Sequence, residues 1–173
     1  ARGDPRPESH HLNVETIKLG QLVSPARQWA ARKAILKPLI RRSLCAIQKE
    51  RNDNGSPTLG LFKPLKIKRL HITANDADWT AKQKAILSQK ALGFEKAPRG
   101  ELEKIPYDFA YEFSCDDQGC RGHKMGCTDW EMAEAYRRWR RKYGDKWEAE
   151  LRKNFERDMI SKFDTHFCVG TLH

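Results

Sequence analysis

The segment CDDQGCRGHKMGCTDWE, residues 115–131, constrains the fold more than any other part of the sequence. It places Cys115, Cys120, His123 and Cys127 within thirteen residues, in the spacing C-x4-C-x2-H-x3-C. Three cysteines and one histidine are a standard tetrahedral ligand set for structural zinc. The glycines between them supply the positive φ angles that so tight a loop requires. We therefore predict a zinc site with these four residues as ligands.

Two other interpretations of the segment stay open. Cys115 ends a strand-like run, which is also typical of a buried core thiol followed by a glycine-rich turn. A disulfide within the loop is the third interpretation. The chain has five cysteines, an odd count without framework spacing, and no visible secretory signal. These features favour a reducing, cytoplasmic setting over a disulfide framework.

The segment resembles two known families. In ligand set and compactness the loop is similar to a retroviral-type zinc knuckle, which is spaced C-x2-C-x4-H-x4-C. The longer run PYDFAYEFSCDDQGCRGHKMGCTDWE resembles the core of an uncharacterised prokaryotic protein family with an aromatic strand, a GH-type loop and a DWE helix start. The matching positions are Tyr107, Phe109, Tyr111, Phe113, Gly122, His123, Asp129, Trp130 and Glu131. No activity is known for that family, so the resemblance implies relatives but no function.

The run before the loop has the clearest period in the chain. Its aromatic residues and Cys115 share one parity, which predicts a strand over residues 105–115 with one apolar face. Such a row of aromatics is core in most sheets and a base-stacking platform in some RNA-binding modules. Asp108 and Glu112 lie on the opposite face, where they would repel phosphate, so we expect the aromatics to be core.

Helix signals lie on both sides of this strand. Ser24 and Pro25 begin a helix that runs to about residue 51, with a kink or break at Pro38. At 100° per residue its inner stripe consists of Trp29, Leu36, Ile40 and Ile47.

The second half of the chain contains two further helix signals. Thr128 and Glu131 form a capping box for a helix that Gly144 ends, and Asp145 caps the next helix. Further strands are expected over residues 13–23, 64–73 and 163–169, and a short helix over 80–90. The predicted fold is α+β, a small mixed sheet packed by several helices, with the Cys/His loop between a strand and a helix. Residues 1–11 are expected to form an extended arm, and residues 12–173 a single domain.

Charge favours an anionic partner. The net charge is +10, and residues 24–72 hold twelve Lys or Arg against only Glu50 and Asp53. No apolar run approaches the length of a membrane span, so no membrane contact is expected. We predict binding to the phosphate backbone of DNA or RNA, with weak sequence preference and a steep salt dependence. A subunit of a larger nucleoprotein assembly is a further interpretation of the same basic surface. The predicted contact residues are Arg27, Lys37, Arg41, Arg42, Lys49, Lys66, Lys68, Arg137, Arg138 and Arg141.

An enzymatic alternative rests on carboxylates and histidine. Asp129, Glu131, Asp164 and His166 are residue types that metal-dependent nucleases use. Glu131 also has a capping role, and the sequence lacks a phosphate-binding glycine loop, a GxSxG elbow, an HExxH motif and the H-x-E pair of deaminases. The sequence therefore favours a binding protein over an enzyme, with a metal-dependent nuclease as the alternative.

Overall fold

The computed structural model describes residues 13–91 and 103–170 of the 173-residue chain. The predicted arm at residues 1–11 lies outside the described residues. Within the described residues the fold is α+β, with two three-stranded sheets. In this part of the chain no helix is long and apolar enough to cross a membrane.

Contacts divide the described chain into two compact units. Unit 1 takes residues 13–66, 113–122 and 164–170, and unit 2 takes residues 67–91, 103–112 and 123–163. The chain passes repeatedly from one unit to the other, so neither unit is a continuous segment. The expectation of a single domain over residues 12–173 stays a prediction.

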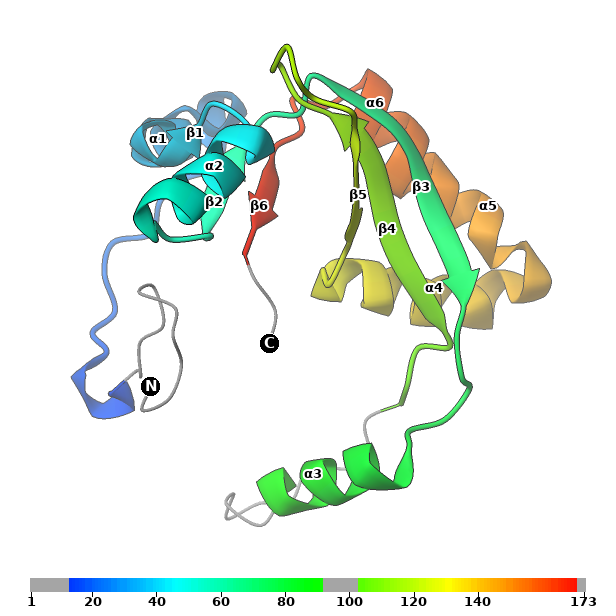
Figure 1. The fold of residues 1–173 in the computed structure, drawn as a ribbon. Helices are drawn as coiled ribbons and strands as arrows, with labels where there is room; N and C mark the ends of the chain where they lie inside the picture. The colour runs from blue at the N-terminus through cyan, green and yellow to red at the C-terminus, as the bar shows by residue number, and fades with distance from the viewer. Residues whose placement is uncertain (1–12, 92–102, 171–173) are drawn as a thin grey trace. The chain divides into compact units, whose positions relative to one another are not determined.

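Unit 1 contains a small sheet and short helices (Figure 1). Its strands β1 (Ile40–Arg41), β2 (Gly60–Phe62) and β6 (Phe167–Val169) lie in the order β1-β2-β6, with β1 parallel and β6 antiparallel to β2. Its helices are η1 (Val14–Thr16), α1 (Ala26–Leu36), η2 (Lys37–Leu39) and α2 (Leu44–Asn54). Phe62 is fully buried, with the rings of Phe113 and Phe167 at 5.7 and 6.1 Å.

The helix predicted from residue 24 to residue 51 forms two separate helices with the break expected at Pro38, but the single core-facing stripe predicted along it is wrong. Pro38 lacks an N–H for the helix ladder, and the chain there forms a 3-10 turn, then β1, then a separate helix α2. At the start of α1, residues 27–29 have positive φ angles, so α1 is not a regular right-handed helix there. Consequently only Ile47 of the predicted stripe is buried, while Trp29 is 53% exposed. The strand predicted over residues 13–23 is also wrong, because the described structure there is only the 3-10 turn η1.

Unit 2 is a sheet covered by helices. Its sheet has the order β3-β4-β5, formed by β3 (Lys66–Ala74), β4 (Tyr107–Ser114) and β5 (His123–Gly126), although Lys66 and the last two residues of β4 group with unit 1. Backbone bonds from Leu65 to Ser114 and from Asn75 to Pro106 show that β3 and β4 are antiparallel. The helices are α3 (Ala81–Ala91), α4 (Trp130–Tyr143), η3 (Gly144–Lys146), α5 (Trp147–Arg152), the π-helix η4 (Lys153–Asp158) and α6 (Met159–Ser161).

The aromatic face of β4 is core. Phe109 and Tyr111 are buried, and the ring of Tyr107 lies 5.4 Å from that of Tyr136 on α4 and 4.8 Å from that of Trp147 on α5. Figure 1 shows α4 and α5 on one face of this sheet. The helices therefore cover the surface that a base-stacking platform would need to expose.

An ion pair between Arg152 of α5 and Glu156 of η4 hydrogen-bonds to the backbone at the edge of β3. Glu156 accepts a hydrogen bond from the backbone N–H of Leu70 at 2.7 Å, and Arg152 donates to the Leu70 carbonyl at 2.7 Å. Arg152 and Glu156 are themselves 3.1 Å apart. This pair satisfies backbone groups that an edge strand otherwise offers to another chain.

Burial predicts which leucine the helical layer depends on. Leu151 on α5 is completely buried, so Leu151→Ala should destabilise the protein by about 2–5 kcal/mol through lost contacts and a residual cavity. Ile160→Ala is the matched control, because Ile160 is 45% exposed and should cost far less. Urea unfolding followed by circular dichroism measures both changes, and equal losses in the two variants would contradict the assigned core.

Candidate metal centre

Four metal-ligating side chains converge in the structure. The ligand atoms of Cys45, Cys115, Cys120 and His123 all lie within 4.8 Å of one another. Within the described residues this is the one group of three or more Cys, His, Asp or Glu side chains close enough to hold a metal ion. Three of the four were predicted from the loop spacing, and the fourth comes from helix α2.

The start of α2 positions Cys45. Ser43 is the N-cap, and its hydroxyl oxygen accepts a hydrogen bond from the N–H of Ala46 at 3.0 Å. The same hydroxyl donates to Oδ2 of Asp117 in the loop at 2.8 Å, and Ser43 is 1% exposed. Since all these residues belong to unit 1, the cap fixes the first turn of α2 against the loop that supplies the other cysteines.

The loop between β4 and β5 turns its ligands inward through local hydrogen bonds. The N–H of Cys120 donates to the carbonyl of Asp117 at 3.0 Å, and the N–H of Cys115 donates to Sγ of Cys120 at 3.2 Å. Gly122 has a φ of 92°, which a residue with a side chain rarely adopts. This turn brings His123, the next residue, to the same cluster.

Electrostatics distinguish the individual ligands. Hydrogen bonds from the N–H groups of Cys115 and Gly122 lower the pKa of the Cys120 thiol. Burial, followed by the neighbouring thiols of Cys120 and Cys115, raises the pKa of Cys45 to about 12. Burial also lowers the pKa of His123, which favours the neutral imidazole that coordinates metals.

Metal binding is the chemistry that this set of groups supports. Three sulfur atoms in close contact repel one another as thiolates unless a cation lies between them. None of the five cysteines forms a disulfide, so each of these thiols can coordinate a metal. The Cys3His cluster could therefore hold a metal ion.

Cys127 is the predicted ligand that the structure does not bring into the cluster. Residues His123–Gly126 form strand β5, and the extended chain moves away by about 3.3 Å per residue. The N–H of Cys127 donates to the carbonyl of Phe109 at 2.8 Å, and burial raises the pKa of its thiol. The segment between β4 and α4 thus includes the strand β5, which the sequence did not predict.

The predicted basic residues divide between the two units. In unit 1, Arg41 pairs with Glu50, whereas five others are exposed and form no ion pair with a described residue, namely Arg27, Lys37, Arg42, Lys49 and Lys66. In unit 2, Lys68 lies 3.3 Å from Glu112 and Arg137 pairs with Glu134 and Glu103. Arg138 and Arg141 are exposed on α4.

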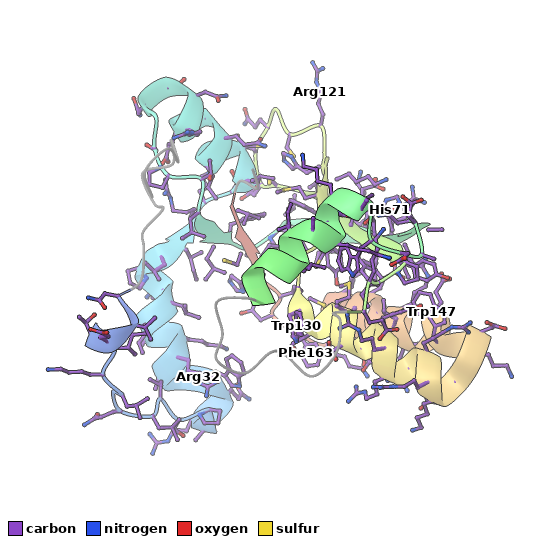
Figure 2. The ribbon with its side chains drawn as sticks, turned by 90° about the horizontal axis from the view of Figure 1, so that it is seen from below. Arg32, His71, Arg121, Trp130, Trp147 and Phe163 are labelled. Atoms are coloured by element: carbon purple, nitrogen blue, oxygen red, sulfur yellow. The ribbon has the colours of Figure 1, made fainter. Side chains whose placement is uncertain are left out.

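Arg121 is a basic residue of the loop that the predicted contact set omitted. It is exposed, and Figure 2 shows its side chain extending away from the loop. Its position directly after the predicted ligand Cys120 could have identified it from the sequence as a basic residue beside the metal site.

The four residues of the nuclease alternative form no metal-binding group within the described residues. Asp129 and Glu131 begin α4 in unit 2, where Asp129, and not Thr128, caps the helix by accepting from the N–H of Glu131 at 2.8 Å. Asp164 belongs to unit 1 and lies 2.6 Å from Lys63. The ring of His166 contacts the carbonyl of Asp164 at 3.0 Å.

Fold and cluster together define a small α+β protein with a candidate Cys3His metal centre. The chain belongs to the DUF8757 family, a domain of unknown function that matches residues 40–173. The matched region includes all four residues of the cluster and excludes α1. The expected resemblance to an uncharacterised family is confirmed. No curated protein and no solved structure matches the chain.

Two cysteine variants test the composition of the cluster. Cys45→Ala should abolish stoichiometric metal binding, because it removes one of four ligands, whereas Cys127→Ala should retain it. Metal content per chain, measured by elemental analysis on protein purified without chelators, provides the comparison. Loss of metal in Cys127→Ala with retention in Cys45→Ala would support the ligand set predicted from the loop spacing alone.

Proposed function

We propose that this protein binds the phosphate backbone of DNA or RNA through a basic surface of unit 1, and that a structural zinc ion organises this surface. The observation that supports the proposal best is that cations without an ion pair to a described residue stand next to the ligands of the Cys3His cluster in the sequence. The proposal links the metal to the surface because each of these cations lies within four residues of a cysteine that would hold the metal.

Zinc suits the cluster best among common metals. Sulfur and imidazole donors select thiophilic metals, and Cys3His is a closed tetrahedral set without room for a reacting water. The metal would therefore be structural, holding the first turn of α2 against the loop. Cysteines without disulfides and a thiolate-bound metal are compatible with a reducing, cytoplasmic setting.

Three cations flank the ligands in unit 1, and we call them the cluster-flanking cations: Arg42, Lys49 and Arg121. Arg42 directly precedes the cap of α2, Lys49 lies four residues after Cys45 on the same helix face, and Arg121 follows Cys120. All three are exposed and form no ion pair with a described residue. Exposed, uncompensated cations on a rigid support are typical of backbone contacts to nucleic acid.

Removal of the metal should loosen this support. Treatment with a strong zinc chelator should lower the melting temperature, because binding to the folded state alone stabilises that state. Added Zn²⁺ should restore the original value and Mg²⁺ should not, since thiolates bind magnesium poorly. An unchanged melting temperature in metal-depleted protein would contradict a structural zinc ion.

Charge reversal tests the surface. Arg42→Glu combined with Arg121→Glu should weaken binding to a DNA or RNA duplex by at least about tenfold at low salt, and should reduce the slope of log K against log salt by about two. The control is Lys82→Glu with Lys146→Glu, which makes the same change in net charge on exposed residues of unit 2. Fluorescence anisotropy at several salt concentrations measures both pairs. Equal binding by the two double variants would contradict the assigned surface, and cleavage of the probe in Mg²⁺ or Mn²⁺ would favour the nuclease alternative.

A further inference from the structure

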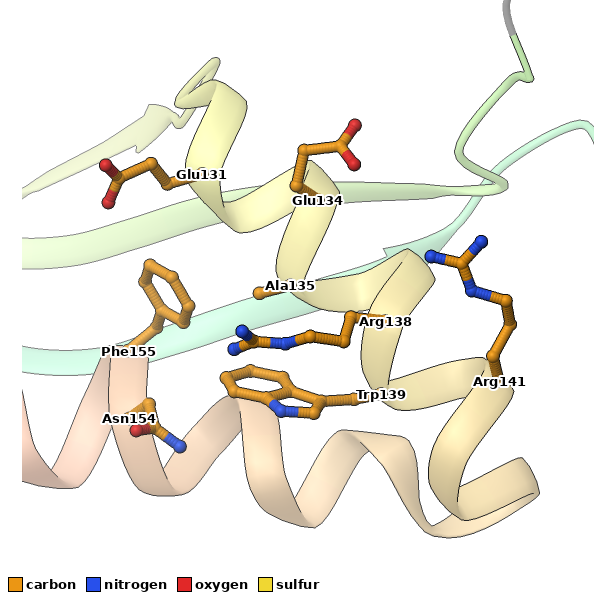
Figure 3. A pocket seen from close by; sticks show the side chains of 8 residues that line it. All are labelled: Glu131, Glu134, Ala135, Arg138, Trp139, Arg141, Asn154 and Phe155. Atoms are coloured by element: carbon orange, nitrogen blue, oxygen red, sulfur yellow. The ribbon is translucent and has the colours of Figure 1, made fainter.

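A second site lies in unit 2, where a hollow of about 480 Å³ separates α4 from the π-helix η4 (Figure 3). Ala135, Trp139 and Phe155 supply its apolar lining, and the polar lining comes from Glu131, Arg138, Arg141 and other residues. The volume falls within the usual range for small-molecule sites. Glu131, a residue of the nuclease alternative, thus shares one hollow with Arg138 and Arg141, two predicted phosphate contacts.

The π-helix explains why the hollow exists. Wide turns over Lys153–Asp158 displace Asn154 and Phe155 from regular α-helical positions. The carbonyl of Phe155 accepts a hydrogen bond from the hydroxyl of Tyr111 at 2.5 Å, so a residue of β4 satisfies a backbone group on the widened helix. Short π-helical segments of this kind occur frequently at functional sites.

Arg138 presents a flat cationic surface in the hollow. Its guanidinium lies over the indole of Trp139 at 5.3 Å from the ring centroid, and Trp139 is 8% exposed. Figure 3 shows the Arg138 side chain extended along the indole. Arg138 forms no ion pair with a described residue, so the face of the guanidinium away from Trp139 is available to a planar ligand.

The remaining polar groups suit the two ends of a nucleotide. Figure 3 shows Glu131 and Arg141 toward opposite ends of the hollow. Neither forms an ion pair with a described residue, which leaves Glu131 as an acceptor for N–H groups and Arg141 as a partner for an anion. Asn154 donates its amide N–H to the carbonyl of Glu150 at 2.8 Å, and its Oδ1 remains an acceptor.

We propose that this hollow binds one nucleotide. Its base stacks on Arg138 and donates N–H hydrogen bonds to Glu131 and Asn154, and its phosphate binds Arg141. Stacking on an arginine plane is a common mode of recognition for unstacked bases. The inference rests on the proposed nucleic-acid function for the class of ligand, and adds a contact to the base where that function needs only the backbone. The nucleotide is either free or part of a single strand.

The test compares GMP, ribose 5-phosphate and a single-stranded pentanucleotide containing guanine, each titrated into the full chain by calorimetry. Arg138→Lys keeps the charge but loses the plane, so it should weaken nucleotide binding about fivefold or more. Arg157→Lys is the matched control, because Arg157 is exposed in unit 2 and does not line the hollow. GMP should also bind more tightly than ribose 5-phosphate by a similar factor, since the sugar phosphate lacks a base.

The outcomes separate the two sources of nucleotide. An Arg138-dependent affinity for GMP supports a free nucleotide, and a dependence seen only with the pentanucleotide supports a strand. Unchanged binding of both GMP and the pentanucleotide in Arg138→Lys would overturn the inference.

Failure of this inference is distinguishable from failure of the proposed function. The variant with Arg42→Glu and Arg121→Glu leaves the hollow intact, so it should keep Arg138-dependent nucleotide binding while losing duplex binding. If duplex binding depends on the cluster-flanking cations but Arg138→Lys changes nothing, only the nucleotide site is refuted.

Discussion

The structure depends on the close approach of three thiols and an imidazole from separate parts of the chain. Cys45 lies in the first turn of a helix, and Cys115, Cys120 and His123 belong to a loop that follows much later in the sequence. Three thiolates whose sulfur atoms lie within 4.8 Å of one another repel, whereas a cation bound between them makes the same arrangement favourable. A metal ion bound there would connect the short, glycine-containing loop to the eleven-residue helix α2. It therefore connects local chain geometry to the proposed surface.

The neighbouring contacts are consistent with that dependence. Ser43 caps α2 and reaches Asp117 in the loop, so a neutral hydrogen-bond donor reinforces the link that the metal would make. The cluster-flanking cations have no acidic partner among the described residues. Arg41, which directly precedes Arg42, instead forms an ion pair with Glu50. In unit 2 the acids and bases are more fully paired, and the core is built from the aromatics of β4 and the helices over them. Backbone binding and nucleotide binding would then belong to surfaces with different chemistry.

Local signals predicted much of this fold, and long-range contacts explain what they missed. The alternation that ends at Cys115 predicted β4 and its buried face, and Gly144 predicted the end of α4, because both depend on nearby residues. The ligand set was only partly predictable. Spacing identified the loop, but Cys45 reaches the cluster through tertiary folding, and no spacing rule connects it to Cys115. Cys127 was included because the sequence did not show that β5 would carry it away. The break at Pro38 was predicted, but the core-facing stripe across it was wrong, because a helical period of 100° per residue does not continue through the change of direction after Pro38.

The coordination shell of the bound metal tests the central claim most directly. X-ray absorption at the zinc edge, on the full chain purified without chelators, should give three sulfur atoms near about 2.3 Å and one nitrogen near about 2.0 Å. The same shell in Cys127→Ala, together with its loss in Cys45→Ala, would place two distant segments of the chain on one ion, as the structure implies for Cys45 and the loop. A shell made mainly of nitrogen and oxygen, or one with fewer than three sulfur atoms, would contradict the account.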